Sequence, residues 1–142
     1  MNITVISVGK IKEKYFTAAI DEYSKRLSRF AKLNIIEVAD EKIPDNASEK
    51  EMEQIKEKEG NKILAKLPQN SFVVTLCIEG KEHSSEELAK KIADISMTSS
   101  HITFIIGGSL GLSDTVKSKS ALRLSFGKMT LPHQLMRVVL LE

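Results

Sequence analysis

The chain is poor in the residue that builds disulfide-rich and many metal-bound proteins. Its 142 residues contain a single cysteine, Cys77, which lies in an apolar run. One thiol can form neither a disulfide framework nor the ligand set of a structural zinc site. We expect Cys77 to be a small buried core residue, with a reactive thiol as the alternative.

Long apolar runs are also absent. No stretch of eighteen apolar residues occurs, so the sequence predicts no membrane-spanning helix. Residues 1–9 alternate between apolar and polar and end at Gly9, without the basic segment and apolar core of a signal peptide. We therefore expect a cytoplasmic protein that does not bind a membrane.

Several catalytic signatures are missing. The sequence has no GxGxxG dinucleotide fingerprint, no GxxxxGKS or GxxxxGKT phosphate loop, no nucleophile elbow, no carboxylate pair and no metal-ligand spacing. These absences disfavour hydrolysis by the corresponding routes and predict no bound metal. Internal repeats, low-complexity tracts and linkers are absent too, so we expect one domain over residues 1–142.

Charge is unevenly distributed, although the net charge is only +2. Residues 10–32 carry seven basic and three acidic side chains, which gives a net charge of +4. Residues 113–137 carry five basic side chains and one acidic side chain, which also gives a net charge of +4. Residues 40–59 carry four basic and eight acidic side chains, a net charge of −4. The positive segments suit contact with a polyanion, and Lys25, Arg26 and Arg29 are candidate RNA-binding residues. Alternatively, they belong to ordinary solvated helix faces.

Hydrophobic periodicity predicts alternating strands and helices, which is the pattern of the α/β class. Strands are expected at residues 3–8, 33–39, 71–78, 101–106 and 121–125. Helices are expected at 13–30, from 48 to about 67, after 84, from 113 to about 120, and in a last segment with Pro132 in its first turn. Capping boxes, Ser48 to Glu51 and Ser84 to Glu87, mark two of the helix starts.

Two loops in the last third of the chain favour a ligand pocket. Gly107-Gly108-Ser109-Leu110-Gly111 follows one predicted strand, and Phe126-Gly127-Lys128-Met129-Thr130-Leu131-Pro132-His133 follows the next. Loops of this kind meet at the carboxyl edge of an α/β sheet, where ligands bind. Glycine also lets main-chain amides approach a ligand closely. A simple tight turn is the alternative for the first loop.

His133 is the histidine best suited to a site. It stands at a predicted helix start, where the positive end of the helix dipole lowers the pKa of an imidazole. A structural hydrogen bond in the first turn is the alternative. His83 and His101 lie at element edges among polar residues and are expected on the surface.

Two signatures near the C-terminus are the most specific motifs of the chain: Gly-Gly-x-x-Gly-Leu at 107–112 and Met-Thr-x-Pro-His-x-x-x-Arg at 129–137. They stand in order with residues 3–10, 14–27, Glu57-Lys58-Glu59-Gly60, 106–112 and 125–138. Through these segments the sequence resembles the ribosomal RNA large subunit methyltransferase H family over essentially its whole length. This family of S-adenosylmethionine-dependent enzymes belongs to the SPOUT class and methylates N3 of a pseudouridine in helix 69 of bacterial 23S ribosomal RNA. The resemblance implies the same activity here.

The resemblance also implies a fold and a cofactor site. A SPOUT-type sheet would carry helices on both faces, and a C-terminal trefoil knot would form the cofactor pocket. The residues that would wrap S-adenosylmethionine are Leu76, Gly107, Gly108, Phe126, Gly127, Lys128, Met129, Thr130 and Leu131. The family forms homodimers, which is consistent with the very apolar segment 135–141.

Methyl transfer to an imide nitrogen needs alignment and loss of a proton but no metal. His133, near the donor, and Arg137, one helical turn further on, are therefore the candidate catalytic residues. Arg137 would hold a phosphate or the negative charge that develops on the uracil oxygens. A structural salt bridge is the alternative for Arg137.

Members of the family continue with a short tail that contains a Tyr-Arg pair and a basic, His-bearing end. We therefore expect a truncated chain, in which the catalytic residues of that tail have no counterpart. Two other classes stay open: an RNA-binding module without catalysis, and a nucleotide-binding oxidoreductase, which the missing dinucleotide fingerprint disfavours.

Overall fold

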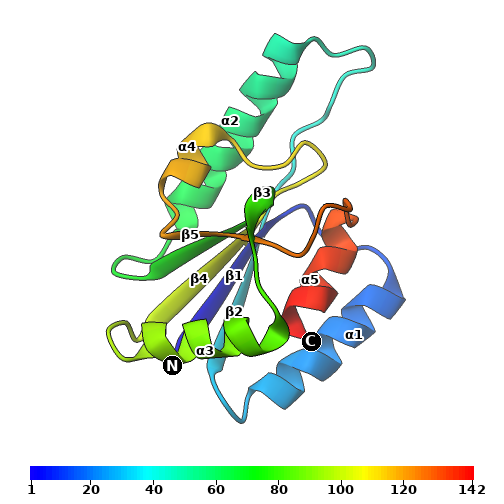
Figure 1. Ribbon diagram of the computed structural model, residues 1–142. Coiled ribbons are helices and arrows are strands. Elements are labelled where there is room, and N and C mark those ends of the chain that lie inside the picture. The colour runs from blue at the N-terminus through cyan, green and yellow to red at the C-terminus, as the bar shows by residue number, and fades with distance from the viewer.

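Five parallel strands form one sheet in the order β2-β1-β4-β3-β5 (Figure 1). The computed structural model describes all residues from 1 to 142. The strands are β1 (Asn2–Val8), β2 (Lys32–Val38), β3 (Phe72–Glu82), β4 (His101–Ile106) and β5 (Leu122–Ser125). The helices are α1 (Lys14–Leu27), α2 (Glu49–Lys66), α3 (Ser85–Ser96), α4 (Asp114–Ser118) and α5 (His133–Leu141). The predicted α/β class is confirmed, and each predicted element is present with its ends shifted by a few residues.

Helices cover both faces of the sheet because the central strands are apolar on both sides (Figure 1). On β4, Phe104 packs into a core shared with α1, α3 and α5, while the next residue, Ile105, packs into a second core shared with α2 and α4. This alternation follows from the two-residue period of a strand. The predicted arrangement of helices on both faces is confirmed.

Local sequence signals set the helix starts. The side chains of Ser48 and Ser84 each accept a hydrogen bond from the backbone N–H three residues on. The carboxylates of Glu51 and Glu87 in turn accept one from the backbone N–H of the serine, so both predicted capping boxes are present. Pro132 is the residue before α5, not part of its first turn as predicted. Its extended backbone (ψ 138°) is incompatible with a helical residue.

Three predictions about single residues need correction. Phe30, the last residue of the helix predicted at 13–30, lies outside that helix and is 78% exposed, because α1 ends at Leu27. Cys77 is only partly buried, since it lies where β3 leaves the sheet ladder. His101 is half-buried, and its Nε2 shares a 2.7 Å hydrogen bond with Thr4 Oγ1 on the neighbouring strand β1.

The last part of the chain crosses the sheet. β5 forms one edge, whereas α5 packs on α1 and β4, so residues 126–132 pass the carboxyl ends of β3 and β4 (Figure 1). The crossing brings the loop after β5 beside the loop after β4. No helix has the length and apolar composition needed to cross a bilayer.

Candidate functional site

A cavity of about 370 Å³ opens at the carboxyl ends of β3, β4 and β5. It is lined by residues 76–79 of β3, by 106–112 at the end of β4 and in the loop after it, and by 124–127 and 129–131 at the end of β5 and in the loop after it, with His133 and Met136 of α5 closing one side. Half of its 22 lining residues are hydrophobic, which is typical of a small-molecule site. The two glycine-containing loops singled out from the sequence therefore meet at one cavity.

An irregularity in β3 opens one wall of this cavity. Leu76 and Lys81 both pair with Leu124 of β5, so the residues between them leave the ladder. Cys77 and Glu79 of this bulge line the cavity. Gly80 allows the bulge because a Cβ there would lie 2.8 Å from the Arg123 backbone. Bulges of this kind commonly redirect side chains next to active sites.

Of the nine predicted cofactor-binding residues, eight line the cavity: Leu76, Gly107, Gly108, Phe126, Gly127, Met129, Thr130 and Leu131. Lys128 is exposed and does not line it. Gly107 closes the turn after β4, since a Cβ there would lie 2.7 Å from the carbonyl carbon of Gly111. Gly127 adopts a φ of +134°, and a Cβ there would meet nothing within 4 Å, so the second loop leaves open space.

His133 lines the cavity from the start of α5. Burial lowers the pKa of His133, and the nearby Arg137 cation lowers it further, while Asp40 opposes the shift. Its Nδ1 is buried and has no hydrogen-bond partner. A neutral imidazole with an unused nitrogen is therefore available beside the cavity.

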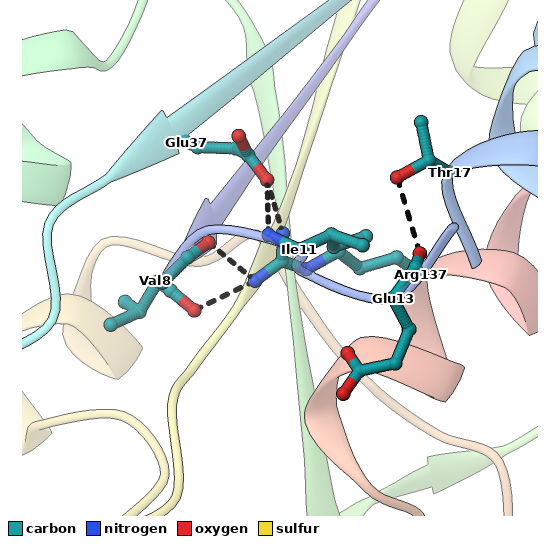
Figure 2. Close-up of polar contacts among 7 residues, drawn as sticks. Val8, Ile11, Glu13, Thr17, Glu37 and Arg137 are labelled. Atoms are coloured by element: carbon teal, nitrogen blue, oxygen red, sulfur yellow. Dashed lines mark hydrogen bonds and ion pairs between the residues drawn. The ribbon is translucent and has the colours of Figure 1, made fainter. Parts of the chain in front are cut away.

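Arg137 lies one turn further along α5 and is only 3% exposed. Its Nη1 donates to Glu37 Oε2 of β2 at 2.8 Å, and its Nη2 donates to the carbonyl oxygens of Val8 (2.8 Å) and Gly9 (2.7 Å) at the end of β1 (Figure 2). The same Glu37 oxygen also accepts from the Ile11 backbone N–H at 3.1 Å. Arg137 is thus turned toward the strand ends and does not line the cavity.

Gly9 lies next to both His133 and Arg137. This residue adopts a φ of +91°, and a Cβ on it would lie 3.7 Å from His133 Cε1 and 3.8 Å from Arg137 Nη2. A side chain at this position would be strained and would press on both groups. Gly9 therefore lets the end of β1, the imidazole and the guanidinium pack together.

The predicted RNA-binding residues lie far from the cavity within one chain. Lys25 and Arg26 are in the last turn of α1, and Arg29 follows it, so all three lie at the amino edge of the sheet (Figure 1). They are exposed, and Arg26 pairs with Glu22 at 3.2 Å and stacks over the Tyr23 ring. The cavity is at the opposite, carboxyl edge.

Sequence reasoning missed three charged residues of the cavity wall. Lys56 of α2, Glu79 of β3 and Lys117 of α4 line it, and Lys117 Nζ pairs with Glu79 Oε1 at 2.5 Å. The pair lowers the pKa of Glu79. No sequence motif joins these residues, because their elements are separated along the chain. No three His, Cys, Asp or Glu side chains gather closely enough to hold a metal ion.

Comparison with known proteins agrees with this architecture. Residues 1–142 match the family described as "Predicted SPOUT methyltransferase". The chain is 63% identical to the ribosomal RNA large subunit methyltransferase H of Clostridium botulinum (strain Kyoto / Type A2) and 61% identical to that of Clostridium novyi (strain NT). It is 59% identical to that of Clostridioides difficile (strain 630). Each alignment covers 100% of this chain and 90% of the relative. The chain therefore belongs to the SPOUT methyltransferases and, among them, to the ribosomal RNA large subunit methyltransferase H family.

Proposed function

We propose that this enzyme transfers a methyl group from S-adenosylmethionine to N3 of a pseudouridine in helix 69 of 23S ribosomal RNA. The observation that carries the proposal is the convergence of the two glycine-containing loops on one cavity at the carboxyl edge of the sheet. The relatives are named for methylation of large-subunit ribosomal RNA, which supports RNA as the substrate. Such an enzyme acts where ribosomes are assembled, in the cytoplasm.

The cavity suits the proposed donor in size and chemistry. Its volume falls within the range of about 300 to 1,000 Å³ that is common for small-molecule sites. Leu76, Phe126 and Leu131 offer apolar contact to an adenine, and the open space at Gly127 leaves room beside the backbone. We assign donor contacts to the eight lining residues named above and none to the Lys128 side chain. When bound, the donor supplies an electrophilic methyl carbon on a positively charged sulfur.

His133 is proposed to accept the proton that N3 loses. The bound donor would supply the methyl group and keep the electron pair of its carbon–sulfur bond, so N3 would have to lose its proton to a group of this chain. The N3 proton passes to a ring nitrogen of His133, which is able to take it because the lowered pKa keeps the imidazole neutral. The cavity wall would contribute by holding N3 in line with the methyl carbon of the donor.

Arg137 is proposed to be a positioning residue, not one that touches the RNA. Its three hydrogen bonds fix α5 to the ends of β1 and β2, and α5 carries His133 at its first position. The cation also helps to keep His133 neutral. This role replaces the substrate contact expected from the sequence, since the Arg137 side chain is buried, does not line the cavity and donates to Glu37, Val8 and Gly9.

We also propose a homodimer that joins the RNA-binding residues to the cavity. Val139 of α5 is 40% exposed, and its apolar neighbours Leu135, Val138 and Leu140 are only partly buried. A second copy packed on this face would cover them. It would also offer its own Lys25, Arg26 and Arg29 to an RNA at the first copy's cavity, which these residues do not reach within one chain.

We infer further that residues 1–142 form one domain whose C-terminal part is tied into a trefoil knot. The crossing of residues 126–132 past the ends of β3 and β4, beside the loop after β4, supports this inference. Threaded chains are rare, so a knot is expected only where it has a structural advantage. Here the advantage would be that threading holds the loops after β4 and β5 against the same ligand.

Two measurements test the proposed function. Calorimetry should detect binding of S-adenosylmethionine and not of NAD, and labelled methyl groups should appear at one pseudouridine of 23S ribosomal RNA when ribosomal particles are the substrate. Binding of NAD alone would favour the oxidoreductase alternative. Binding of RNA without S-adenosylmethionine would favour the non-catalytic module.

A further inference from the structure

The segment Glu57-Lys58-Glu59-Gly60 has no part in the chemistry described above, yet it contains a buried carboxylate. Glu59 of α2 is 5% exposed, whereas Glu49, Glu51 and Glu53 on the same helix are exposed. Burying a carboxylate is unfavourable unless polar partners compensate. Glu59 has one such partner, because its Oε2 accepts a 2.9 Å hydrogen bond from the Glu41 backbone N–H.

The other oxygen of Glu59 faces the glycine turn of the donor cavity. A Cβ on Gly108 would lie 3.6 Å from Glu59 Oε1, and Gly108 itself lines the cavity. Gly108 therefore borders both the carboxylate and the cavity without a side chain of its own. The next residue of α2, Gly60, packs so closely on Ser113 that a Cβ would lie 2.7 Å from its Oγ. This contact fixes α2, and with it Glu59, behind the turn.

The cavity wall itself has no excess of negative charge. Its charged side chains are Lys56, Lys117 and Glu79, and the last two neutralise each other as an ion pair. The proposed donor carries a sulfonium cation, whereas the product S-adenosylhomocysteine carries a neutral thioether at the same atom. A buried carboxylate close to such a cavity favours the cation, because charges interact more strongly where water is excluded.

The surroundings of Glu59 make its charge responsive to a bound cation. The charged groups that face it are Asp40, Glu41 and Lys62, and Lys62 pairs with Glu41 at 2.9 Å. Burial raises the pKa of Glu59, the two carboxylates raise it further, and the hydrogen bond from Glu41 opposes the rise. A cation in the cavity would stabilise the ionised form, and by linkage the ionised form would stabilise the bound cation.

We propose that Glu59 is a specificity-determining residue that makes the cavity prefer the sulfonium donor to the thioether product. The inference rests on the proposed function, since it assumes that the cavity binds S-adenosylmethionine. This preference would help the enzyme to release its product, because Glu59 no longer attracts the ligand once the methyl group has left and the sulfur is neutral.

Calorimetry with both ligands near neutral pH tests the proposal. Glu59→Gln keeps the shape of the side chain and removes its charge. We expect this variant to bind S-adenosylmethionine about tenfold more weakly and to bind S-adenosylhomocysteine with an affinity within about twofold of the wild-type value. Glu49→Gln, which removes an exposed charge from the same helix, should change neither affinity.

The ratio of the two affinities separates this role from simple support of the turn. An equal loss of affinity for both ligands, or no loss for either, would refute the proposal. A wild-type protein that binds neither ligand would instead refute the proposed function. The pH dependence of binding serves as an independent test if Glu59→Gln does not fold. It is measured in His133→Gln, which removes the titrating imidazole of the cavity wall. The preference for the sulfonium ligand should fall as the pH is lowered and Glu59 becomes protonated, because its pKa is raised by burial, and a preference that does not fall would contradict the proposal.

Discussion

Replacing Arg137 with alanine should destabilise the protein by about 3 kcal/mol. Removing one member of a buried ion pair costs roughly 3 to 5 kcal/mol, because the other charge is left without its partner. The side chain of Glu37 is 37% exposed, so water can solvate part of the orphaned carboxylate and the cost falls at the low end of that range. The carbonyl oxygens of Val8 and Gly9 also lose their hydrogen-bond donor, which adds to the loss of unfolding free energy.

Urea and thermal unfolding of the Arg137→Ala variant measure this loss. For a domain of this size, 3 kcal/mol corresponds to a fall in melting temperature of roughly 10 °C. Arg29→Ala removes an exposed arginine and should change the unfolding free energy by less than about 0.5 kcal/mol. Arg137→Lys should recover only part of the stability, since one ammonium group cannot reproduce the planar fork that reaches three acceptors. A loss below about 1 kcal/mol for Arg137→Ala would refute the assignment of Arg137 as the clamp between α5 and the strand ends.

Four further outcomes are expected. Gly107→Val should abolish binding of S-adenosylmethionine, because its Cβ collides with the backbone of the glycine turn; unchanged affinity in calorimetry would contradict the site. Val139→Glu should place an unpaired charge in the dimer contact and yield monomers or aggregates, and light scattering that still finds a dimer at low concentration would contradict the proposed face. Reversing the charges of Lys25 and Arg26 should weaken RNA binding and flatten its dependence on salt, with donor affinity preserved as the internal control. Because the pKa of His133 lies below its usual 6.5, methyl transfer should be constant through neutral pH and fall only at lower pH, where the imidazole becomes protonated; an inflection that persists in His133→Gln would assign the titration to another group.

The sequence alone was sufficient for most of the fold. Periodicity, glycines and capping boxes are local signals, and they located the strands and helices to within a few residues. The places where the prediction failed are governed by contacts from elsewhere in the chain. Phe30 fits the periodicity of α1 but follows its end, and β3 runs on to Glu82 because a bulge restores its pairing with β5.

The residues of the candidate site fall into the same two groups, those set by local sequence signals and those set by contacts with distant parts of the chain. The two glycine-containing loops could be identified from the sequence because glycine in a short loop after an apolar strand has a direct physical meaning. The roles of Arg137 and Glu59 could not, since a charged residue on a helix looks the same in a sequence whether it meets water or a buried partner. Their partners lie at Glu37, Val8 and Glu41, far away along the chain or on another element.

The sequence therefore determined the elements, the family and the loops that form the cavity, because these depend on local periodicity and on motifs that are contiguous in the chain. Only the tertiary structure decided that Arg137 faces the strand ends, that Glu59 is buried behind Gly108, and that the basic end of α1 lies at the edge opposite the cavity. Each of these depends on the strand order and on the crossing of residues 126–132, which bring together segments that no local pattern relates.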